Sequence, residues 1–64
     1  MWYFQNSGIV IIKDNVAYFK LKRYADNVVY AIDFFFYDHT TIEISDKEDL
    51  RVFCKITLEG LEHV

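Results

Sequence analysis

The sequence predicts an α+β fold: a five-stranded antiparallel β-meander followed by one C-terminal α-helix packed on one sheet face. Two observations lead to this prediction. Turn signals divide the first 44 residues into short β-rich runs, and a capping motif followed by helical spacing begins at Ser45. The 64 residues suffice for one small core, so we expect residues 1–64 to form a single two-layer domain.

Four turn signals separate the β-rich runs. They are NSG (6–8), DN (14–15), YADN (24–27) and DHT (38–40). Between them lie five runs rich in β-branched and aromatic residues, at positions 2–5, 9–13, 16–23, 28–37 and 41–44. Short sequential connections join antiparallel neighbours, and this favours a meander.

The loop lengths predict which residues pair, and paired residues share a face. The three-residue loop NSG pairs Phe4 with Val10, and the two-residue loop DN pairs Ile12 with Ala17. With the two later loops, the registers predict one apolar inner face formed by Trp2, Phe4, Val10, Ile12, Ala17, Phe19, Leu21, Val28, Tyr30, Ile32, Phe34, Phe36, Ile42 and Ile44.

The two later loops pair Phe19 with Ile32 and Phe34 with Ile44. The same registers send the intervening side chains to the other face, and this divides the run of three phenylalanines. Phe35 is expected to point outward while its two neighbours point inward. The outer face is predicted to carry Tyr3, Gln5, Ile9, Ile11, Lys13, Val16, Tyr18, Lys20, Lys22, Val29, Ala31, Asp33, Phe35, Tyr37, Thr41 and Glu43.

A helix is expected after the last strand. Ser45 and Glu48 have capping-box spacing, and the apolar residues that follow at helical spacing are Leu50, Phe53, Cys54, Leu58 and Leu61. A strand is the competing interpretation of residues 51–59, because Val52, Cys54, Ile56 and Leu58 also alternate. The cap and the length favour the helix.

The predicted outer face has an apolar and aromatic centre, which is typical of an interaction surface. We therefore expect a small non-enzymatic protein-binding module that acts through this sheet face or a sheet edge. A homodimer is the simplest form, because two-fold symmetry makes one patch complementary to itself, and a host protein is the other expected partner. The predicted binding residues are Ile9, Ile11, Tyr18, Lys20, Val29, Phe35 and Tyr37.

Binding of single-stranded nucleic acid is the alternative function. Aromatic side chains could stack on bases and nearby cations could hold phosphates. The residues for this role are Tyr18, Phe35 and Tyr37 with Lys20, Lys22 and Arg23. The net charge of −3 disfavours broad electrostatic attraction to a polyanion or an anionic membrane.

No residue pattern predicts catalysis, a metal site or a cofactor. His39 follows Asp38 in a predicted loop, but the sequence places no nucleophile beside this pair. Cys54 falls on the apolar side of the predicted helix, where a small buried hydrophobe is the usual role. With one cysteine and no long apolar run, we expect a cytoplasmic protein. The small size suits an accessory inhibitor or modulator encoded by a phage or mobile element.

Overall fold

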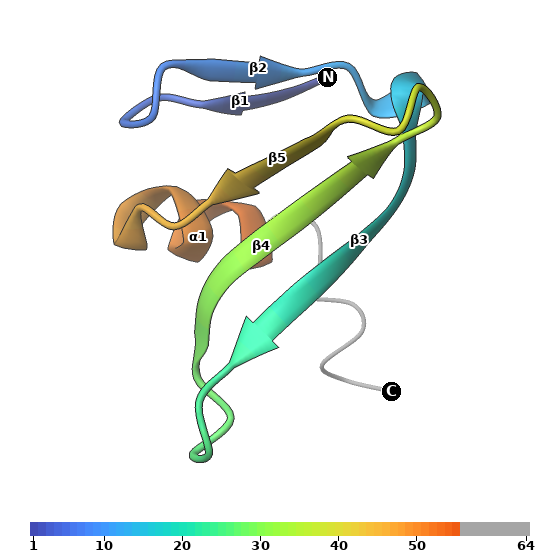
Figure 1. Ribbon diagram of the computed structural model, residues 1–64. Coiled ribbons are helices and arrows are strands. Elements are labelled where there is room, and N and C mark those ends of the chain that lie inside the picture. The colour runs from blue at the N-terminus through green and yellow to red at the C-terminus, as the bar shows by residue number, and fades with distance from the viewer. Residues whose placement is uncertain (56–64) are drawn as a thin grey trace.

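The computed structural model describes residues 1–55, and residues 56–64 lie outside the description. Within residues 1–55, two antiparallel sheets and one helix form an α+β fold (Figure 1). The elements follow one another as β1 (Trp2–Phe4), β2 (Ile9–Ile11), a 3-10 turn η1 (Lys13–Asn15), β3 (Val16–Arg23), β4 (Val29–Phe36), β5 (Thr41–Ile44) and α1 (Lys47–Phe53).

The expected five-stranded meander is divided into two sheets, β1–β2 and β3–β4–β5. The predicted pairing of Ile12 with Ala17 does not form, because η1 replaces the tight hairpin between β2 and β3. The amide of Asn15 donates to the carbonyl of Ile12 at 3.0 Å, and the amide of Tyr37 donates to the carbonyl of Asn15 at 3.2 Å. The second of these bonds ties the connection to the residue that follows β4. Ala17 lies at an irregularity of the β3 ladder and is exposed, contrary to the prediction.

The middle of the three-stranded sheet keeps the predicted faces with different partners. Phe19 lies opposite Phe34, and Phe34 lies opposite Ile42. The sequence predicted Ile32 opposite Phe19 and Ile44 opposite Phe34, so each pairing is displaced by two residues. Side chains alternate with a period of two, and a displacement of two therefore leaves the residues of these pairs on their predicted faces. Val16, beyond the irregularity at the start of β3, packs against the core instead of lying on the outer face.

An irregularity between Lys22 and Arg23 changes the face of the first residues of β4. Arg23 pairs with Val29, and Val29 packs against the core although the sequence analysis placed it outside. Val28 and Tyr30, which were expected inside, are 55% and 41% exposed. A bulge of this kind shifts the alternation by one residue on one strand only.

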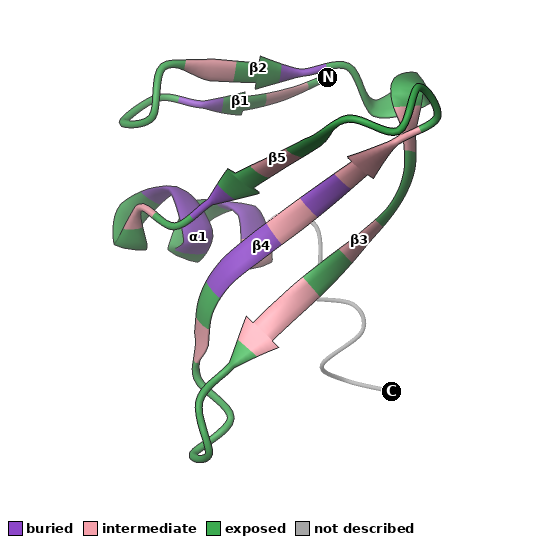
Figure 2. Cartoon of the chain, in the orientation of Figure 1, coloured by how far each residue is buried: buried purple, intermediate pink, exposed green. Residues whose placement is uncertain are grey.

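The first hairpin is displaced by one residue from the predicted register. Phe4 pairs with Ile9, and the amide of Gly8 donates to the carbonyl of Gln5 at 3.3 Å to close a four-residue connection. A one-residue displacement exchanges the two faces of a strand. Ile9 and Ile11 therefore point into the core, and Val10 and Ile12 are the exposed residues, which corrects the prediction for all four (Figure 2).

The helix begins one residue later than its expected cap. Asp46 is the N-cap, and its carboxylate accepts from the amide of Asp49 at 3.0 Å, so Ser45 does not have this role. Residues Lys47–Phe53 are helical, which confirms the helix over the strand for the described part of that segment. Three of the residues that the sequence analysis discussed lie outside the described residues, namely Ile56, Leu58 and Leu61.

The core centres on Phe34, which is completely buried. Its ring lies 5.5 Å from that of Trp2, 5.7 Å from that of Phe4 and 5.6 Å from that of Phe53, measured between centroids. Aromatic rings at such distances and tilts pack favourably beyond the area that they bury. Both sheets and the helix contribute buried core residues, which are Phe4, Ile11, Ile32, Phe34, Ile44, Leu50 and Phe53.

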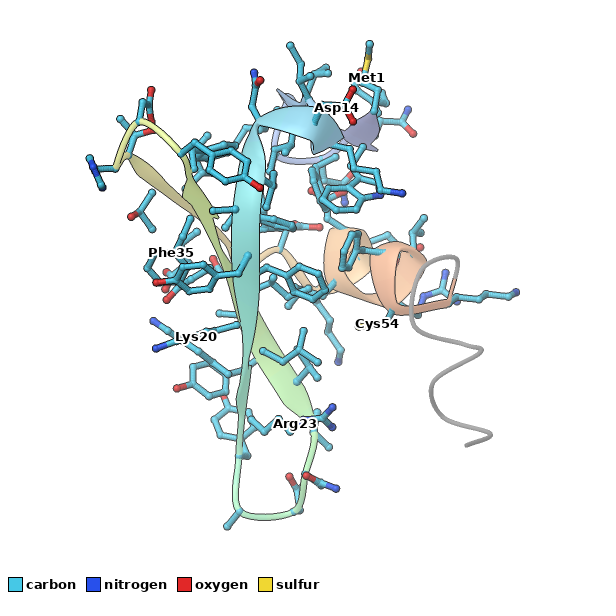
Figure 3. All side chains as sticks on the ribbon, turned by 90° about the vertical axis from the view of Figure 1, so that its right-hand side faces the viewer. Met1, Asp14, Lys20, Arg23, Phe35 and Cys54 are labelled. Atoms are coloured by element: carbon cyan, nitrogen blue, oxygen red, sulfur yellow. The ribbon has the colours of Figure 1, made fainter. Side chains whose placement is uncertain are left out.

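The β1–β2 hairpin and α1 pack toward one face of the three-stranded sheet, and no described element covers the other face (Figure 3). Phe35 and Lys20 point to the uncovered side, away from the helix and Cys54. The run of phenylalanines is therefore divided between the two faces of the sheet: Phe34 belongs to the core and Phe35 to the opposite face.

A candidate protein-binding face

The candidate site is the uncovered face of the β3–β4–β5 sheet, called the open face below. Strand pairing arranges its side chains in rows. Tyr18 lies opposite Phe35 and Phe35 opposite Thr41; in the next row, Lys20 lies opposite Asp33 and Asp33 opposite Glu43. Its residues are Tyr18, Lys20, Lys22, Asp33, Phe35, Thr41 and Glu43.

An aromatic pair forms the centre of the first row. The rings of Tyr18 and Phe35 stack with 4.6 Å between centroids and 14° between planes. The ammonium of Lys20 lies over the Phe35 ring, 5.7 Å from its centroid. Contacts of these two kinds contribute about 0.5–1.5 and about 0.5–1 kcal/mol respectively. They cover Phe35 to an intermediate degree and leave Tyr18 52% exposed.

An ion-pair group joins the two carboxylates of the second row to Lys22, which lies opposite Ala31 in the row beyond. The ammonium of Lys22 lies 2.8 Å from a carboxylate oxygen of Glu43 and 3.2 Å from one of Asp33. The hydrogen bond to Glu43, followed by that to Asp33, raises the pKa of Lys22 above its ordinary range. The three side chains come from three neighbouring strands, so they hold one another in place across the sheet. Asp33 makes its ion pair with Lys22, although Lys20 lies directly opposite it.

The structure brings together three of the residues predicted for binding and separates the rest. Tyr18, Lys20 and Phe35 are neighbours on the open face. Tyr37 is 70% exposed but lies in the turn after β4. The remaining three residues, Ile9, Ile11 and Val29, pack against the core. The prediction that they lie on an outer face is therefore wrong.

Some exposed apolar residues were missed because their registers were mispredicted. Val10 and Ile12 are 49% and 54% exposed, and they line a groove of about 490 Å³ with Tyr37 near the β4–β5 turn. Both candidate registers of the first hairpin pair apolar residues with apolar residues. No local signal in the sequence would have identified the exposed pair.

The turn that contains Asp38 and His39 has a structural explanation. The carboxylate of Asp38 accepts hydrogen bonds from the amide of Thr40 at 3.0 Å and from its hydroxyl at 2.5 Å. These bonds, led by that from the hydroxyl, lower the pKa of Asp38. His39 has a φ of 72° and is exposed. Within residues 1–55, no group of three or more His, Cys, Asp or Glu side chains is placed to hold a metal ion.

Among residues 1–55, no helix has the length and apolar character needed to cross a membrane. In comparisons with known proteins, the chain matches no protein-family model, no curated protein and no solved structure.

Proposed function

We propose that this protein acts by binding another protein chain through the open face, without catalysis, and that its first partner is a second copy of itself. The observation that carries the proposal is the stacked pair of Tyr18 and Phe35 on a sheet face that no described element covers. Aromatic side chains held in fixed positions provide contact area at a low entropic cost, and they are enriched in protein interfaces.

The charge balance of the open face supports self-association. Its two lysines, Lys20 and Lys22, balance its two carboxylates, whereas the whole chain carries −3. Two copies repel each other overall, and this repulsion is smallest where neutral faces meet. A two-fold axis also lets a face with both signs of charge oppose each cation to a carboxylate of the second copy.

The edges of the sheets offer a second mode of contact for the same function. Within residues 1–55, β3 and β5 each pair with one neighbour, so the three-stranded sheet has two open edges. An edge strand can accept a strand of another chain. The β3 edge carries lysines, which discourage such pairing, and this favours the face over the edge.

The contacts on the open face weigh against the nucleic-acid alternative. Lys22 is already held by two carboxylates, and Lys20 lies over the Phe35 ring. Arg23 donates to the carbonyl of Asn27 at the hairpin tip. A base would have to displace Tyr18 or Lys20 to stack on Phe35, which adds a cost to binding that a preformed stacking platform does not have.

We further propose that the protein works in the cytoplasm as an accessory inhibitor or modulator encoded by a phage or mobile element. A chain of 64 residues suits a protein that acts by occupying a surface of its partner. This part of the proposal rests on size and simplicity.

Sedimentation equilibrium tests the dimer. We expect a mass of about twice the 7.7 kDa of the chain, and a return toward monomer in Phe35→Lys and Thr41→Lys. Thr41→Lys is the milder variant, because Thr41 is exposed and the Tyr18–Phe35 stack stays intact. Val52→Lys, at an exposed position on α1, is the matched control and should remain a dimer.

A wild-type protein that stays monomeric at millimolar concentration would rule out self-association and leave a different protein as the partner. Nucleic-acid binding is tested by titrating a labelled single strand at low salt. An equal affinity for the wild type and for Lys20→Glu/Lys22→Glu would eliminate that alternative.

A further inference from the structure

A second apolar groove, of about 490 Å³, lies away from the open face. It is bordered by the tip of the β3–β4 hairpin on one side and by the beginning of α1 on the other. Tyr24, Val28 and Tyr30 line it from the hairpin, and Lys47, Leu50 and Arg51 line it from the helix. The volume is in the range of grooves that hold a ligand or a few side chains of a partner.

The hairpin side of this groove is an ordered apolar surface. The rings of Tyr24 and Tyr30 stack with 4.6 Å between centroids and 23° between planes. Tyr24 is 60% exposed and Val28 is 55% exposed. The bulge beside Arg23 turns Val29 inward and leaves these neighbours outside. The stacked tyrosines and Val28 therefore form an apolar surface that the described part of the chain leaves open.

The helix side of the groove is cationic. Lys47 and Arg51 are four residues apart on α1, so they lie on the same side of the helix one turn from each other. Arg51 is paired with Glu48, whereas Lys47 makes no ion pair with any carboxylate of residues 1–55. Among residues 1–55, no Asp or Glu lines the groove, although acidic residues outnumber basic ones, 10 to 7, in the sequence.

We propose that this groove binds an acidic, apolar segment of another protein. Apolar side chains of that segment would pack against Tyr24, Val28 and Leu50, and its carboxylates would lie near Lys47 and Arg51. Within residues 1–55, the groove combines an apolar floor with two cations and no carboxylate, which complements such a segment and opposes a basic one. The groove uses none of the residues of the open face, so this binding is independent of the proposed dimer.

Fluorescence anisotropy with two labelled decapeptides tests the proposal on the full chain. One peptide alternates leucine and glutamate, and the other alternates leucine and lysine. We expect the leucine–glutamate peptide to bind at least about tenfold more tightly, although the protein is itself acidic. Equal affinities, or tighter binding of the leucine–lysine peptide, would overturn the proposal.

Two substitutions locate the binding. Lys47→Glu should weaken binding of the leucine–glutamate peptide about tenfold, and Val28→Ser should weaken it several-fold. Lys13→Glu makes the same change of charge in η1, which does not line the groove, and should have a much smaller effect. Circular dichroism confirms that each variant is folded. If Lys13→Glu weakens binding as much as Lys47→Glu does, the effect is one of net charge and the assignment to the groove is wrong.

Two further measurements distinguish binding in this groove from binding at the open face and from binding of nucleic acid. Phe35→Lys should leave peptide binding unchanged, because Phe35 belongs to the open face. A labelled single-stranded oligonucleotide should not compete with the peptide. Displacement of the peptide by the oligonucleotide, with loss of both interactions in Lys47→Glu, would instead identify a site for phosphate.

Discussion

The carboxylate of Asp49 accepts a hydrogen bond from the hydroxyl of Ser7 at 2.6 Å and so joins the first turn of the chain to the first turn of α1. The same carboxylate accepts from the amides of Asn6 and Ser7, at 3.1 and 2.8 Å. Asp49 is 5% exposed and lies 42 residues from Ser7 in the sequence. The β1–β2 hairpin shares no strand pairing with the larger sheet, so these polar bonds and the aromatic core hold it in place.

Asp49→Asn is expected to lower the thermal midpoint of unfolding by about 5–10 °C, as measured by circular dichroism. The asparagine side chain has the same shape as the aspartate side chain, but only one of its two terminal atoms accepts hydrogen bonds. In the wild type, the donors of Asn6 and Ser7 use both carboxylate oxygens. Glu48→Gln, one residue away on the exposed side of the same turn, is the control and should change the midpoint little. Equal midpoints for Asp49→Asn and the wild type would show that the side chain contributes nothing to holding the hairpin.

The pH dependence of stability should identify the same carboxylate. Burial would raise the pKa of Asp49, but the hydrogen bonds from Ser7 and Asn6 outweigh it and lower the pKa. A lowered pKa in the folded state means that the unfolded chain binds the proton more readily, so stability falls as the pH drops below about 4. The difference in midpoint between the wild type and Asp49→Asn should therefore be constant near neutral pH and shrink below about pH 4. A difference that persists undiminished at pH 2 would contradict this assignment.

The sequence predicts the three-stranded sheet well for a specific reason. From Tyr18 to Lys22 in β3, the predicted partners in β4 differ from the observed ones by two positions. An error of two leaves the faces intact, so the inward position of Phe34 and the outward position of Phe35 are both predicted correctly. The stacking of Tyr18 on Phe35 was not predicted, because it depends on the register itself.

The first hairpin could not be predicted, because local patterns do not distinguish its two registers. Residues 9–12 are all aliphatic, so either face of β2 can be apolar. Gly8 fits the end of a three-residue or a four-residue connection, and its φ of 68° suits both. The observed register is the one in which Ser7 reaches Asp49. A contact between residues so far apart leaves no periodic signal in the sequence.

Substitutions at Ile11 and Ile12 test that register directly. Ile11 is 1% exposed and Ile12 is 54% exposed. Ile11→Ala should lower the free energy of unfolding by about 2–5 kcal/mol, whereas Ile12→Ala should change it by less than about 1 kcal/mol. Urea titration followed by tryptophan fluorescence measures both. The register predicted from the sequence buries Ile12 and exposes Ile11. A larger loss of stability in Ile12→Ala than in Ile11→Ala would therefore support that register over the observed one.

The run of phenylalanines provides the sharpest comparison of core and open face. Phe34 is completely buried against four other rings. Phe34→Ala should therefore cost about 3–5 kcal/mol, which is comparable to the whole stability of a domain of this size. Phe34→Leu retains part of the packing and should remain folded at reduced stability.

Phe35→Ala removes a half-buried ring and its stack on Tyr18, so it should cost clearly less than Phe34→Ala. Chemical denaturation measures these differences in the monomer, at protein concentrations below the dissociation constant of any dimer. Above that concentration, Phe35→Ala should lose additional stability relative to the wild type, because association stabilises only the chain that retains the ring. If the cost of Phe35→Ala does not depend on concentration, its ring is covered by Tyr18 and Lys20 alone and takes no part in an interface between copies.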